Sequence, residues 1–247
     1  MRQSVPRYEV GAGRPAAELP LALCDLHQSL AVGEKIVCSL KPTIGDEWTP
    51  QLAADLVIGA GFISINSIIA KSGEITFELI RIRSLPDIVS ANMSLLIVGL
   101  NPSLYSADQS ISYARPGNRF WPAVLAAKIV SKDRDPKHAL YYHGVGMTDL
   151  VRRATRRADE LGQEEVTSGF TRIERQIAWL RPKVVCFMGL GGWRAVSGKK
   201  ATAGIQAQTL GNRPVYLMPN PSGLNAHCRL EDFVKHFRKV AQFVKHI

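Results

Sequence analysis

The fold is decided by the stretch Leu95-Leu96-Ile97-Val98-Gly99-Leu100-Asn101-Pro102-Ser103. Its first half is apolar with a β-branched centre, and it stops abruptly at Gly99 and Asn101-Pro102. This pattern is typical of a buried parallel strand that runs into a loop. Open α/β sheets bind their ligands at the carboxyl ends of the strands. The polar side chains of this loop, chiefly Asn101 and Ser103, are therefore candidates for chemistry.

A second Asn-Pro-Ser sequence, at 220–222, follows a second apolar run at 215–218. In isolation, Asn-Pro is first of all a turn signal, and either copy could merely shape its loop. Two copies at equivalent places, each after a predicted strand, instead predict one shared site.

Outward from these loops, strands and helices alternate from Leu85 to the C-terminus. Continuous apolar runs predict buried strands, and helical spacing of apolar residues predicts the helices between them. Thr167 is the expected N-cap of one helix, which Pro182 would stop. We therefore predict an α/β fold with a mostly parallel, roughly four-stranded sheet and helices on both faces. The predicted strands are 94–100, 146–150, 184–188 and 215–218, and the helices begin near 118, 167, 189 and 230.

Residues 1–84 have a different pattern and predict a small α+β appendage before an α/β domain of residues 85–247. Residues 1–20 show no sustained period and predict a loose or draped arm. Thr49-Pro50 fits the start of a helix that Gly59 and Gly61 would end. Two strands, 62–69 and 75–82, would follow as a hairpin. A scaffold or lid is the favoured role, and a winged DNA-reading element is the alternative.

The net charge of +10 is unevenly distributed. Residues 1–90 hold 8 Lys/Arg and 10 Asp/Glu and carry −2, whereas residues 91–247 hold 23 and 11 and carry +12. The positive field therefore belongs to the segment with both Asn-Pro-Ser sequences. Such a field attracts polyanions, nucleic acid first among them. A generically basic surface explains the charge equally well, so both interpretations stay open.

Composition also argues against several classes of protein. The longest apolar stretch, 56–70, is too short and too polar for a span of roughly 20 residues, and no signal core follows Met1. We expect a soluble, cytoplasmic protein that makes no membrane contact. The four cysteines form no C-x-x-C pair, which predicts reduced thiols and no metal site. No G-x-G-x-x-G or Walker sequence occurs, and we expect no cofactor.

Four motifs along the chain then resemble a known family. They are Gly99–Ser103, Tyr113–Trp121 (Tyr-Ala-Arg-Pro-Gly-Asn-Arg-Phe-Trp), Gly146–Val151 (Gly-Met-Thr-Asp-Leu-Val) and Asn220–Asn225 (Asn-Pro-Ser-Gly-Leu-Asn). In order and position they look like the motifs of the mismatch-specific uracil/thymine-DNA glycosylases of the uracil-DNA glycosylase superfamily. The resemblance covers Leu85 to the C-terminus and leaves residues 1–84 outside. It implies a three-layer sandwich.

The resemblance implies hydrolysis of the N-glycosidic bond of uracil, or of another deaminated or mismatched base, in DNA. By the same resemblance, Asn101 positions the attacking water, and Asn220 is the second catalytic residue. An amide is a poor general base, so the reaction depends on leaving-group ability and preorganised charge. Fast uracil enzymes of the superfamily carry Asp and His at these two motifs. The two asparagines therefore predict a slower, broader enzyme.

The resemblance assigns base binding to Tyr113, which would stack on the flipped base, together with Leu100, Ser103, Ser106 and Asn118. An ordinary core or rim tyrosine is the alternative for Tyr113. Ser103 replaces a glycine found in many members. Tyr105 and Ser106 stand at the small-residue wall of the pyrimidine pocket. These departures put thymine and 5-substituted bases in doubt as substrates.

The resemblance assigns Leu224 as the wedge that enters the vacated base stack, and it places Ser222, Gly223 and Asn225 beside it as the residues of the wedge and DNA-backbone contact. A surface turn residue is the alternative. Ala226 takes the place of an arginine that can contact the opposite strand, with His227 or Arg229 as possible replacements. Asp149 is expected to organise its loop through hydrogen bonds rather than to act as a base. The candidate phosphate contacts, each also explicable as a structural arginine, are Arg115, Arg119, Arg152, Arg153 and Arg229.

The sequence therefore predicts a monofunctional DNA glycosylase that opens base-excision repair and acts as a monomer. Its partner would be DNA that contains uracil or a mismatch, double-stranded and, as a further option, single-stranded. Lyase chemistry is not expected, because no lysine stands in the motifs to form a Schiff base. A catalytically weak damage-binding module is the main alternative, and an enzyme of free nucleosides is the third.

Overall fold

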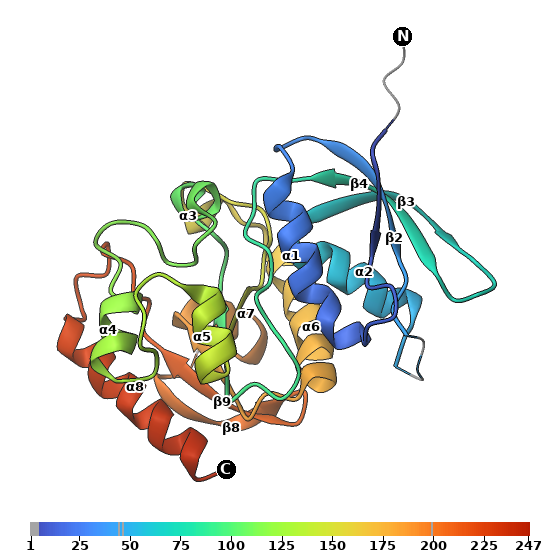
Figure 1. Cartoon of the computed structure of the whole chain (residues 1–247). Coiled ribbons are helices and arrows are strands. Elements are labelled where there is room, and N and C mark those ends of the chain that lie inside the picture. The colour runs from blue at the N-terminus through green and yellow to red at the C-terminus, as the bar shows by residue number, and fades with distance from the viewer. Residues whose placement is uncertain (1–4, 44, 46, 199) are drawn as a thin grey trace.

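The structure is a computed structural model that describes residues 5–43, 45, 47–198 and 200–247, and it contains two β-sheets with helices packed around them (Figure 1). The elements in chain order are β1 (Arg7–Val10), α1 (Leu19–Ser29), β2 (Lys35–Leu40), α2 (Pro50–Gly59), β3 (Phe62–Ile69), β4 (Ile75–Arg81), β5 (Leu95–Gly99), α3 (Leu104–Gln109), α4 (Phe120–Ala126), α5 (Pro136–His143), β6 (Val145–Asp149), α6 (Gln163–Leu180), β7 (Val184–Met188), α7 (Leu190–Ser197), β8 (Gly204–Leu210), β9 (Arg213–Met218) and α8 (Leu230–Lys245).

The larger sheet has the strand order β6-β5-β7-β9-β8. The first four strands run parallel, and β8 pairs antiparallel with β9 at the edge. The predicted α/β fold with a mostly parallel sheet is confirmed. The sequence did not predict β8, because its side chains are mostly exposed and its pairing is irregular between Ile205 and Thr209. Such a strand lacks the apolar signal of its buried neighbours.

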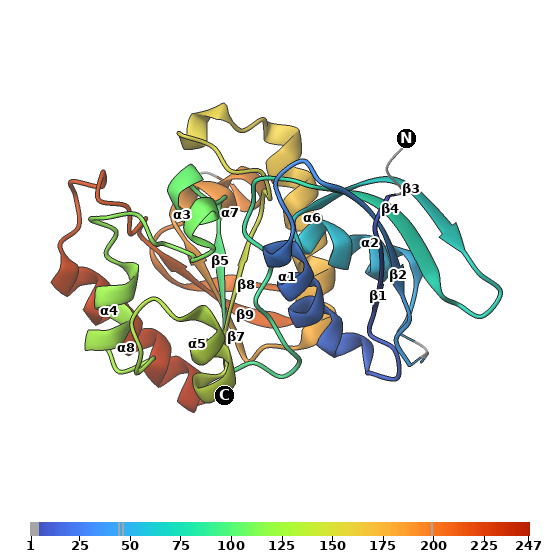
Figure 2. The same cartoon turned by 45° about the horizontal axis from the view of Figure 1, so that its top comes forward.

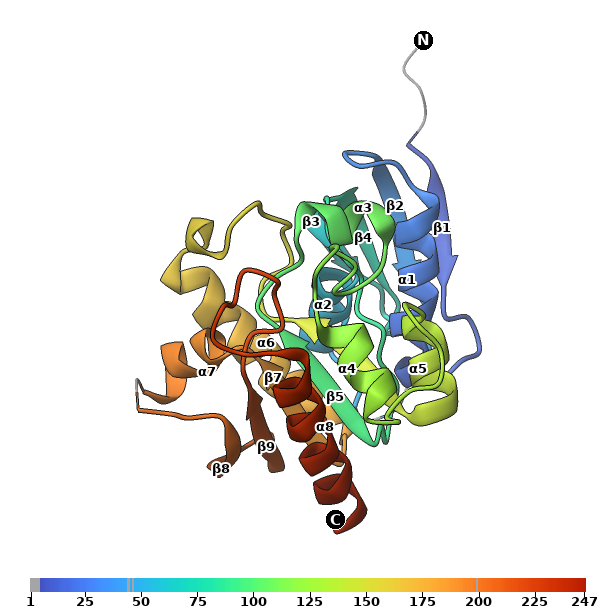
Figure 3. The same cartoon turned by 90° about the vertical axis from the view of Figure 1, so that its left-hand side faces the viewer.

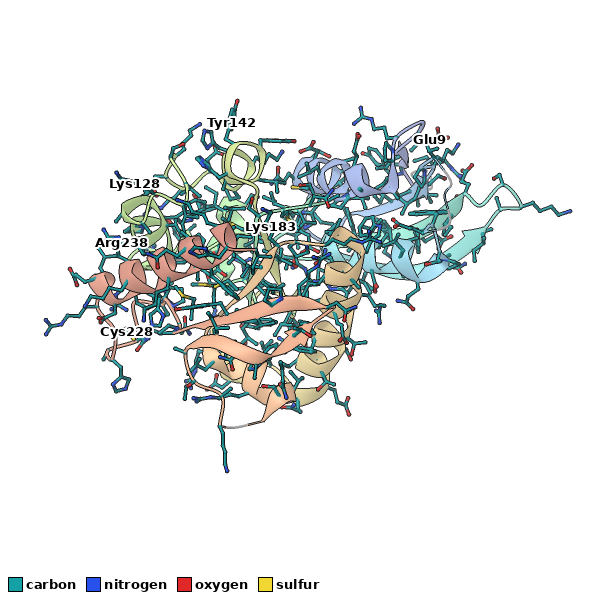
Figure 4. The ribbon with its side chains drawn as sticks, turned by 90° about the horizontal axis from the view of Figure 1, so that it is seen from below. Glu9, Lys128, Tyr142, Lys183, Cys228 and Arg238 are labelled. Atoms are coloured by element: carbon teal, nitrogen blue, oxygen red, sulfur yellow. The ribbon has the colours of Figure 1, made fainter. Side chains whose placement is uncertain are left out.

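Helices cover both faces of this sheet, which makes three layers. One face packs against α4 and α8, and Figure 3 shows these two helices in front of the strands. The other face packs against α6 and α7 through buried residues such as Ile173, Ile177 and Trp193. The predicted range of α8 is confirmed. Its apolar stripe, which carries Phe233, Phe237 and Val240, is buried against the sheet, so the sequence pattern marks the whole helix. In Figure 4, Cys228 marks the start of α8, far from Glu9 on β1.

The smaller sheet has the order β1-β2-β4-β3, and α1 and α2 share its apolar core. The predicted α2 and the β3–β4 hairpin are confirmed, and the Thr49 side chain accepts a hydrogen bond from the Leu52 amide as the N-cap. The prediction of a loose or draped arm over residues 1–20 is wrong for residues 7–10 and 19–20, which belong to β1 and α1. Residues 7–10 pair in parallel with β2, because backbone hydrogen bonds add an edge strand without an apolar pattern.

The two sheets are joined through α6. The Arg175 guanidinium donates two hydrogen bonds of 2.7 Å to the Asp55 carboxylate of α2, and the Asp87 amide donates to the Gly59 carbonyl at 2.8 Å. Trp179 of α6 packs against the core of the smaller sheet. A division of the chain at residues 84 and 85 into two domains stays a proposal.

Two local predictions differ from the structure. Thr167 is not an N-cap, because α6 begins at Gln163 and the Glu165 carboxylate accepts a hydrogen bond from the Gly162 amide, one turn earlier. The helix expected from about residue 118 ends at Ala126, before Ile129. The short helices α3 and α5 were not predicted.

Among the described residues, no helix is long and apolar enough to cross a bilayer.

Candidate active site

A cavity of about 890 Å³ lies at the carboxyl ends of the parallel strands. Figure 2 brings this edge forward and shows α3 and α7 grouped around it. The chain after β5 leads to α4 on one face of the sheet, and the chain after β7 leads to α7 on the other face. The cavity therefore sits at the point where α/β sheets bind ligands. The structure brings ten of the predicted site residues to its wall, namely Leu100, Asn101, Ser103, Ser106, Tyr113, Asn118, Asn220, Ser222, Leu224 and Asn225.

Asn101 follows β5, and its side-chain amide is fixed from three sides. Nδ2 donates to the Pro102 carbonyl at 3.2 Å, to the Arg153 carbonyl at 3.2 Å and to Thr155 Oγ1 at 2.8 Å. Since a carbonyl can only accept, this surrounding determines which end of the amide is nitrogen. No described residue donates to Oδ1. The amide oxygen is therefore left as an oriented acceptor at the cavity wall.

Thr155 was not identified from the sequence as a site residue. Its hydroxyl accepts from Asn101 and donates to the Arg157 carbonyl at 2.8 Å, and its side chain is almost fully buried. Its amide also donates to the Pro102 carbonyl at 3.2 Å. The contact joins residues 54 apart in the chain. No local pattern could have revealed it, because both partners stand in loops.

Asn220 follows β9 and shapes its own loop. Its Oδ1 accepts a hydrogen bond from the Ser222 amide at 3.0 Å, and its backbone carbonyl accepts from Asn225 Nδ2 at 2.8 Å. The first of these is an Asx turn, in which the side chain replaces a backbone acceptor. The turn presents Leu224 to solvent with 80% of its surface exposed. An exposed leucine at the mouth of a cavity fits the predicted wedge position.

Arg119 ties the Leu224 loop to the segment that carries Tyr113. One guanidinium nitrogen donates to the carbonyls of Ser222 at 3.1 Å and Asn225 at 3.0 Å, and the Arg119 amide donates to the Pro221 carbonyl at 2.9 Å. Gly223 allows this approach, because a Cβ there would lie 2.9 Å from a backbone oxygen of the facing segment. Arg119 thus holds the Leu224 loop in place through its hydrogen bonds, and its contact with DNA stays a prediction.

Tyr113 stacks on Phe120 with ring centroids 4.2 Å apart and an interplanar angle of 22°. Its φ of +58° is unusual for an aromatic residue and marks a constrained backbone. Its ring lines the cavity, while its hydroxyl is buried and has no hydrogen-bond partner among the described residues. Burial raises the pKa of this hydroxyl well above its usual value. The hydroxyl therefore stays protonated, and the ring offers a flat wall.

Three of the predicted base-binding polar side chains have local structural partners. Ser103 is the N-cap of α3, since its Oγ accepts from the Ser106 amide at 3.1 Å and also donates to Ser106 Oγ at 3.1 Å. Asn118 Oδ1 accepts from the Phe120 amide at 2.9 Å, at the start of α4. Their contact with a base stays a prediction.

Asp149 is the last residue of β6 and lines the floor of the cavity, with 8% of its surface exposed. Its backbone carbonyl accepts hydrogen bonds from Arg172 at 2.9 Å and Arg152 at 3.3 Å. No described residue donates to its carboxylate, so the hydrogen bonds that Asp149 makes here run through its backbone carbonyl and not through its side chain. Burial raises the pKa of the Asp149 carboxyl to about 6, an effect reinforced by Asp87 and opposed by Arg152 and Arg172.

A buried ion cluster lies behind Asp149. Asp87 accepts from Arg172 at 2.8 Å and from Thr148 Oγ1 at 2.6 Å, and its carboxylate lies 2.9 Å from Arg152. Burial disfavours the Asp87 anion, but the two arginines outweigh it and hold the pKa of Asp87 below its usual value. Arg152 is only 6% exposed, so the prediction that it contacts phosphate is wrong.

The other arginines of the site edge differ in exposure and pairing. Arg153 donates to Glu165 and to the Glu160 carbonyl, which ties it to the start of α6. Arg115 is exposed and lines the cavity, and Arg229 is exposed at the start of α8. Arg156 and Arg157, which were not predicted as contacts, also line the mouth. The mouth is therefore rich in cations.

The chain is similar to a known protein family and to a solved structure. A solution NMR structure of a "putative Uracil DNA glycosylase" from Methanosarcina acetivorans is 20% identical, with a TM-score of 0.43, and the match covers 64% of this chain and 98% of that one. Residues 86–245 match the family described as the uracil DNA glycosylase superfamily. This match confirms the predicted resemblance at the level of the superfamily, whose members are DNA glycosylases, and leaves the mismatch-specific subfamily as a prediction. The chain belongs to the uracil DNA glycosylase superfamily.

Proposed function

We propose that the protein is a monofunctional DNA glycosylase of the mismatch-specific type, which removes uracil and related deaminated bases from DNA. The observation that carries this proposal is the orientation of Asn101. Three acceptors hold its Nδ2, and no described residue donates to its Oδ1, so this oxygen is available to accept from a molecule in the cavity that Asn101 lines. A side chain fixed in this way can hold one water molecule without reorganisation during the reaction, which is the condition for efficient preorganised catalysis.

The reaction begins when the target nucleotide leaves the base stack. Leu224 fills the gap in the stack, and Tyr113, backed by Phe120, stacks on the base. Unpairing the base costs a few kcal/mol, and this cost is smallest for a mispaired base, which contributes selectivity. Asn225 and Arg119 support the wedge through the backbone of its loop. Arg115, Arg156 and Arg229 are the exposed cations available to phosphate.

In the chemical step the C1′–N1 bond breaks and its electron pair leaves with the base as a uracil anion. The water held by Asn101 adds to C1′ of the resulting oxocarbenium-like sugar, and its proton passes to solvent. Asn101 orients this water rather than deprotonating it, because an amide is not a strong base. Among the described residues the cavity wall contains no lysine, and this supports hydrolysis without a Schiff base.

The test uses oligonucleotides that contain uracil opposite different partners, with a panel of other lesions beside it. Wild-type protein should leave alkali-labile abasic sites. Asn101→Ala should lower the single-turnover rate by on the order of 100-fold or more while DNA affinity changes little. Equal rates for the two proteins would remove Asn101 from the mechanism.

A catalytically weak damage-binding module is the second candidate, and it is favoured by the exposed Leu224 and the stacked Tyr113, which would serve binding alone. Tight binding of uracil-containing duplex without any abasic product at any pH would support it over the enzyme.

A further inference from the structure

The chain between β4 and β5 lies along the outer edge of the larger sheet. β6 is the edge strand there, and Ile88 exchanges backbone hydrogen bonds of 3.0 and 2.8 Å with Met147 of β6 in an antiparallel bridge. Nearer the cavity, the Ala154 amide donates to the Arg83 carbonyl at 3.1 Å. Residues 83–88, the strap, therefore extend along β6 and along the loop that follows it.

The strap is fixed at its start and reaches the cavity. Just before it, the Ile82 amide donates to the Gly61 carbonyl at 3.1 Å, at the beginning of β3. The hydroxyl of Ser84, which is buried, donates to the Arg152 carbonyl. Leu85 is also buried and lines the cavity. The smaller sheet thus determines where the strap meets the site.

The loop after β6 is held between the strap and Asn101. Ala154 bonds to the strap, whereas its two neighbours bond to Asn101, whose Nδ2 donates to the Arg153 carbonyl at 3.2 Å and to Thr155 Oγ1 at 2.8 Å. Successive residues of an extended segment turn their backbone groups to opposite sides. The position of the strap therefore determines where two partners of Asn101 lie.

The Arg83 side chain holds the other end of the Asn101 loop. Its guanidinium donates two hydrogen bonds to the Asp108 carboxylate of α3, the one from Nε at 2.7 Å. α3 follows its N-cap Ser103, two residues after Asn101. A bidentate pair fixes orientation as well as distance. Both side chains are about half exposed, so the pair contributes little to folding stability and can be changed without unfolding the protein.

We propose, on the basis of the proposed glycosylase function, that Arg83 is a positioning residue for Asn101, and that through it the N-terminal part of the chain supports the catalytic site. Its carbonyl holds the loop after β6 and its guanidinium holds α3, and both routes lead to the same amide. A catalytic side chain must stay within about 0.5 Å of its productive position. Arg83 lies before residues 86–245, the region that matches the superfamily.

The test measures single-turnover excision of uracil from duplex DNA at saturating protein and, separately, the Kd for that DNA. Arg83→Gln and Asp108→Asn each remove the bidentate pair and keep the backbone hydrogen bond from Ala154. We expect both to slow excision about fivefold or more, because the water held by Asn101 is then less precisely placed. The two changes shift the net charge in opposite directions, so a rate loss that both share cannot come from weaker attraction of DNA.

Exchange of the two ends supplies the rescue. Arg83→Asp combined with Asp108→Arg rebuilds the ion pair in reverse and should recover most of the rate that each single change loses. Lys137→Gln is the matched control, since Lys137 pairs with Asp25 of α1 in an exposed contact that also joins the N-terminal part to the larger sheet's helices but lies outside the cavity. This variant should keep the wild-type rate.

Three other results would overturn the proposal. Wild-type rates in both single variants, in a protein that excises uracil, would remove Arg83 from the site and leave the glycosylase proposal standing. Unchanged rates with opposite shifts in Kd would make the two side chains determinants of DNA affinity only. No excision by wild type at any pH would overturn the proposed function and the positioning role together, so the failures are distinguishable.

Discussion

Nδ2 of Asn101 lies 2.8 Å from Oγ1 of Thr155, and this hydrogen bond links the loop after β5 to the loop after β6. Thr155 in turn donates to the Arg157 carbonyl, so its one hydroxyl proton is already used and its oxygen is available as an acceptor. The amide of Asn101 is thus held by an acceptor that cannot rotate away without losing a bond of its own.

Thr155→Val should therefore slow uracil excision about tenfold or more. The change keeps the shape but leaves Asn101 Nδ2 and the Arg157 carbonyl each one partner short, a cost of about 1–3 kcal/mol for a buried group. DNA affinity should change little, since Thr155 is buried. Single-turnover rates and equilibrium binding measure the two effects separately. Thr155→Ser keeps the hydroxyl and should retain the wild-type rate. A wild-type rate in the valine variant would contradict the role of the Asn101–Thr155 hydrogen bond.

Leu224→Ala should affect duplex and single-stranded substrates differently. Leu224 is mostly exposed, so its truncation costs little folding stability. Filling a gap in the stack matters only where a partner strand competes for the base. We expect excision from duplex to fall about tenfold and excision from single strands to change by less than about twofold. An unchanged ratio between the two substrates would count against the wedge.

Tyr113→Phe and Tyr113→Ala should separate the ring from its hydroxyl. The hydroxyl is buried without a described partner, so its removal should leave the free energy of unfolding unchanged or raise it by about 1 kcal/mol. The ring remains on Phe120, and excision should be retained. Alanine removes the stacking surface, worth about 1–3 kcal/mol per base, and should slow excision at least tenfold. Loss of activity in the phenylalanine variant would show that the hydroxyl contacts substrate.

Asp149→Asn should change how stability depends on pH. The carboxyl pKa rises from 3.8 to about 6 on folding, so the folded state binds this proton more tightly than the unfolded state. Stability is therefore lost as the pH rises from about 4 to about 6, and it stays lost above that range. The loss amounts to up to about 3 kcal/mol, since one pKa unit is about 1.4 kcal/mol.

Urea unfolding at a series of pH values measures this difference. The asparagine variant should be more stable than wild type near pH 8, and the difference should vanish near pH 4. The neighbouring Asp87 titrates with the opposite sign, because its pKa is lowered. Its contribution is present in both proteins and largely cancels in the comparison. A stability difference that does not vary with pH would contradict the raised pKa.

The elements that could be predicted are those whose own side chains carry the signal. β7 is buried on both faces, and its range was predicted as the structure has it. β1 and β8 were missed because edge strands depend on backbone pairing and keep many side chains exposed. The start of α6 was placed one turn late because glycine at 162 gives no cap signal by itself, and the hydrogen bond from its amide to Glu165 became evident only in the structure.

The site could be predicted where a loop directly follows a strand. Asn101 and Asn220 both do, and both line the cavity. Thr155 could not be predicted, because its role depends on a contact across 54 residues. That the Asp149 carboxylate lines the cavity could not be predicted either, because sequence gives the end of a strand but not the face to which its last side chain turns. The burial of Arg152 beside Asp87 is likewise a property of the packed structure.

The contact between Gly117 and Gly223 has a mechanical consequence. This contact and the three hydrogen bonds from Arg119 hold the Leu224 loop against the segment that follows Tyr113. The two segments are therefore expected to move together. The protein thus presents the Leu224 loop and the Tyr113 segment to DNA as one preassembled surface and not as two independent loops. If the proposed function is right and the substrate is duplex DNA, deformation during the encounter would fall on the double helix, and its weakest base pairs would open first.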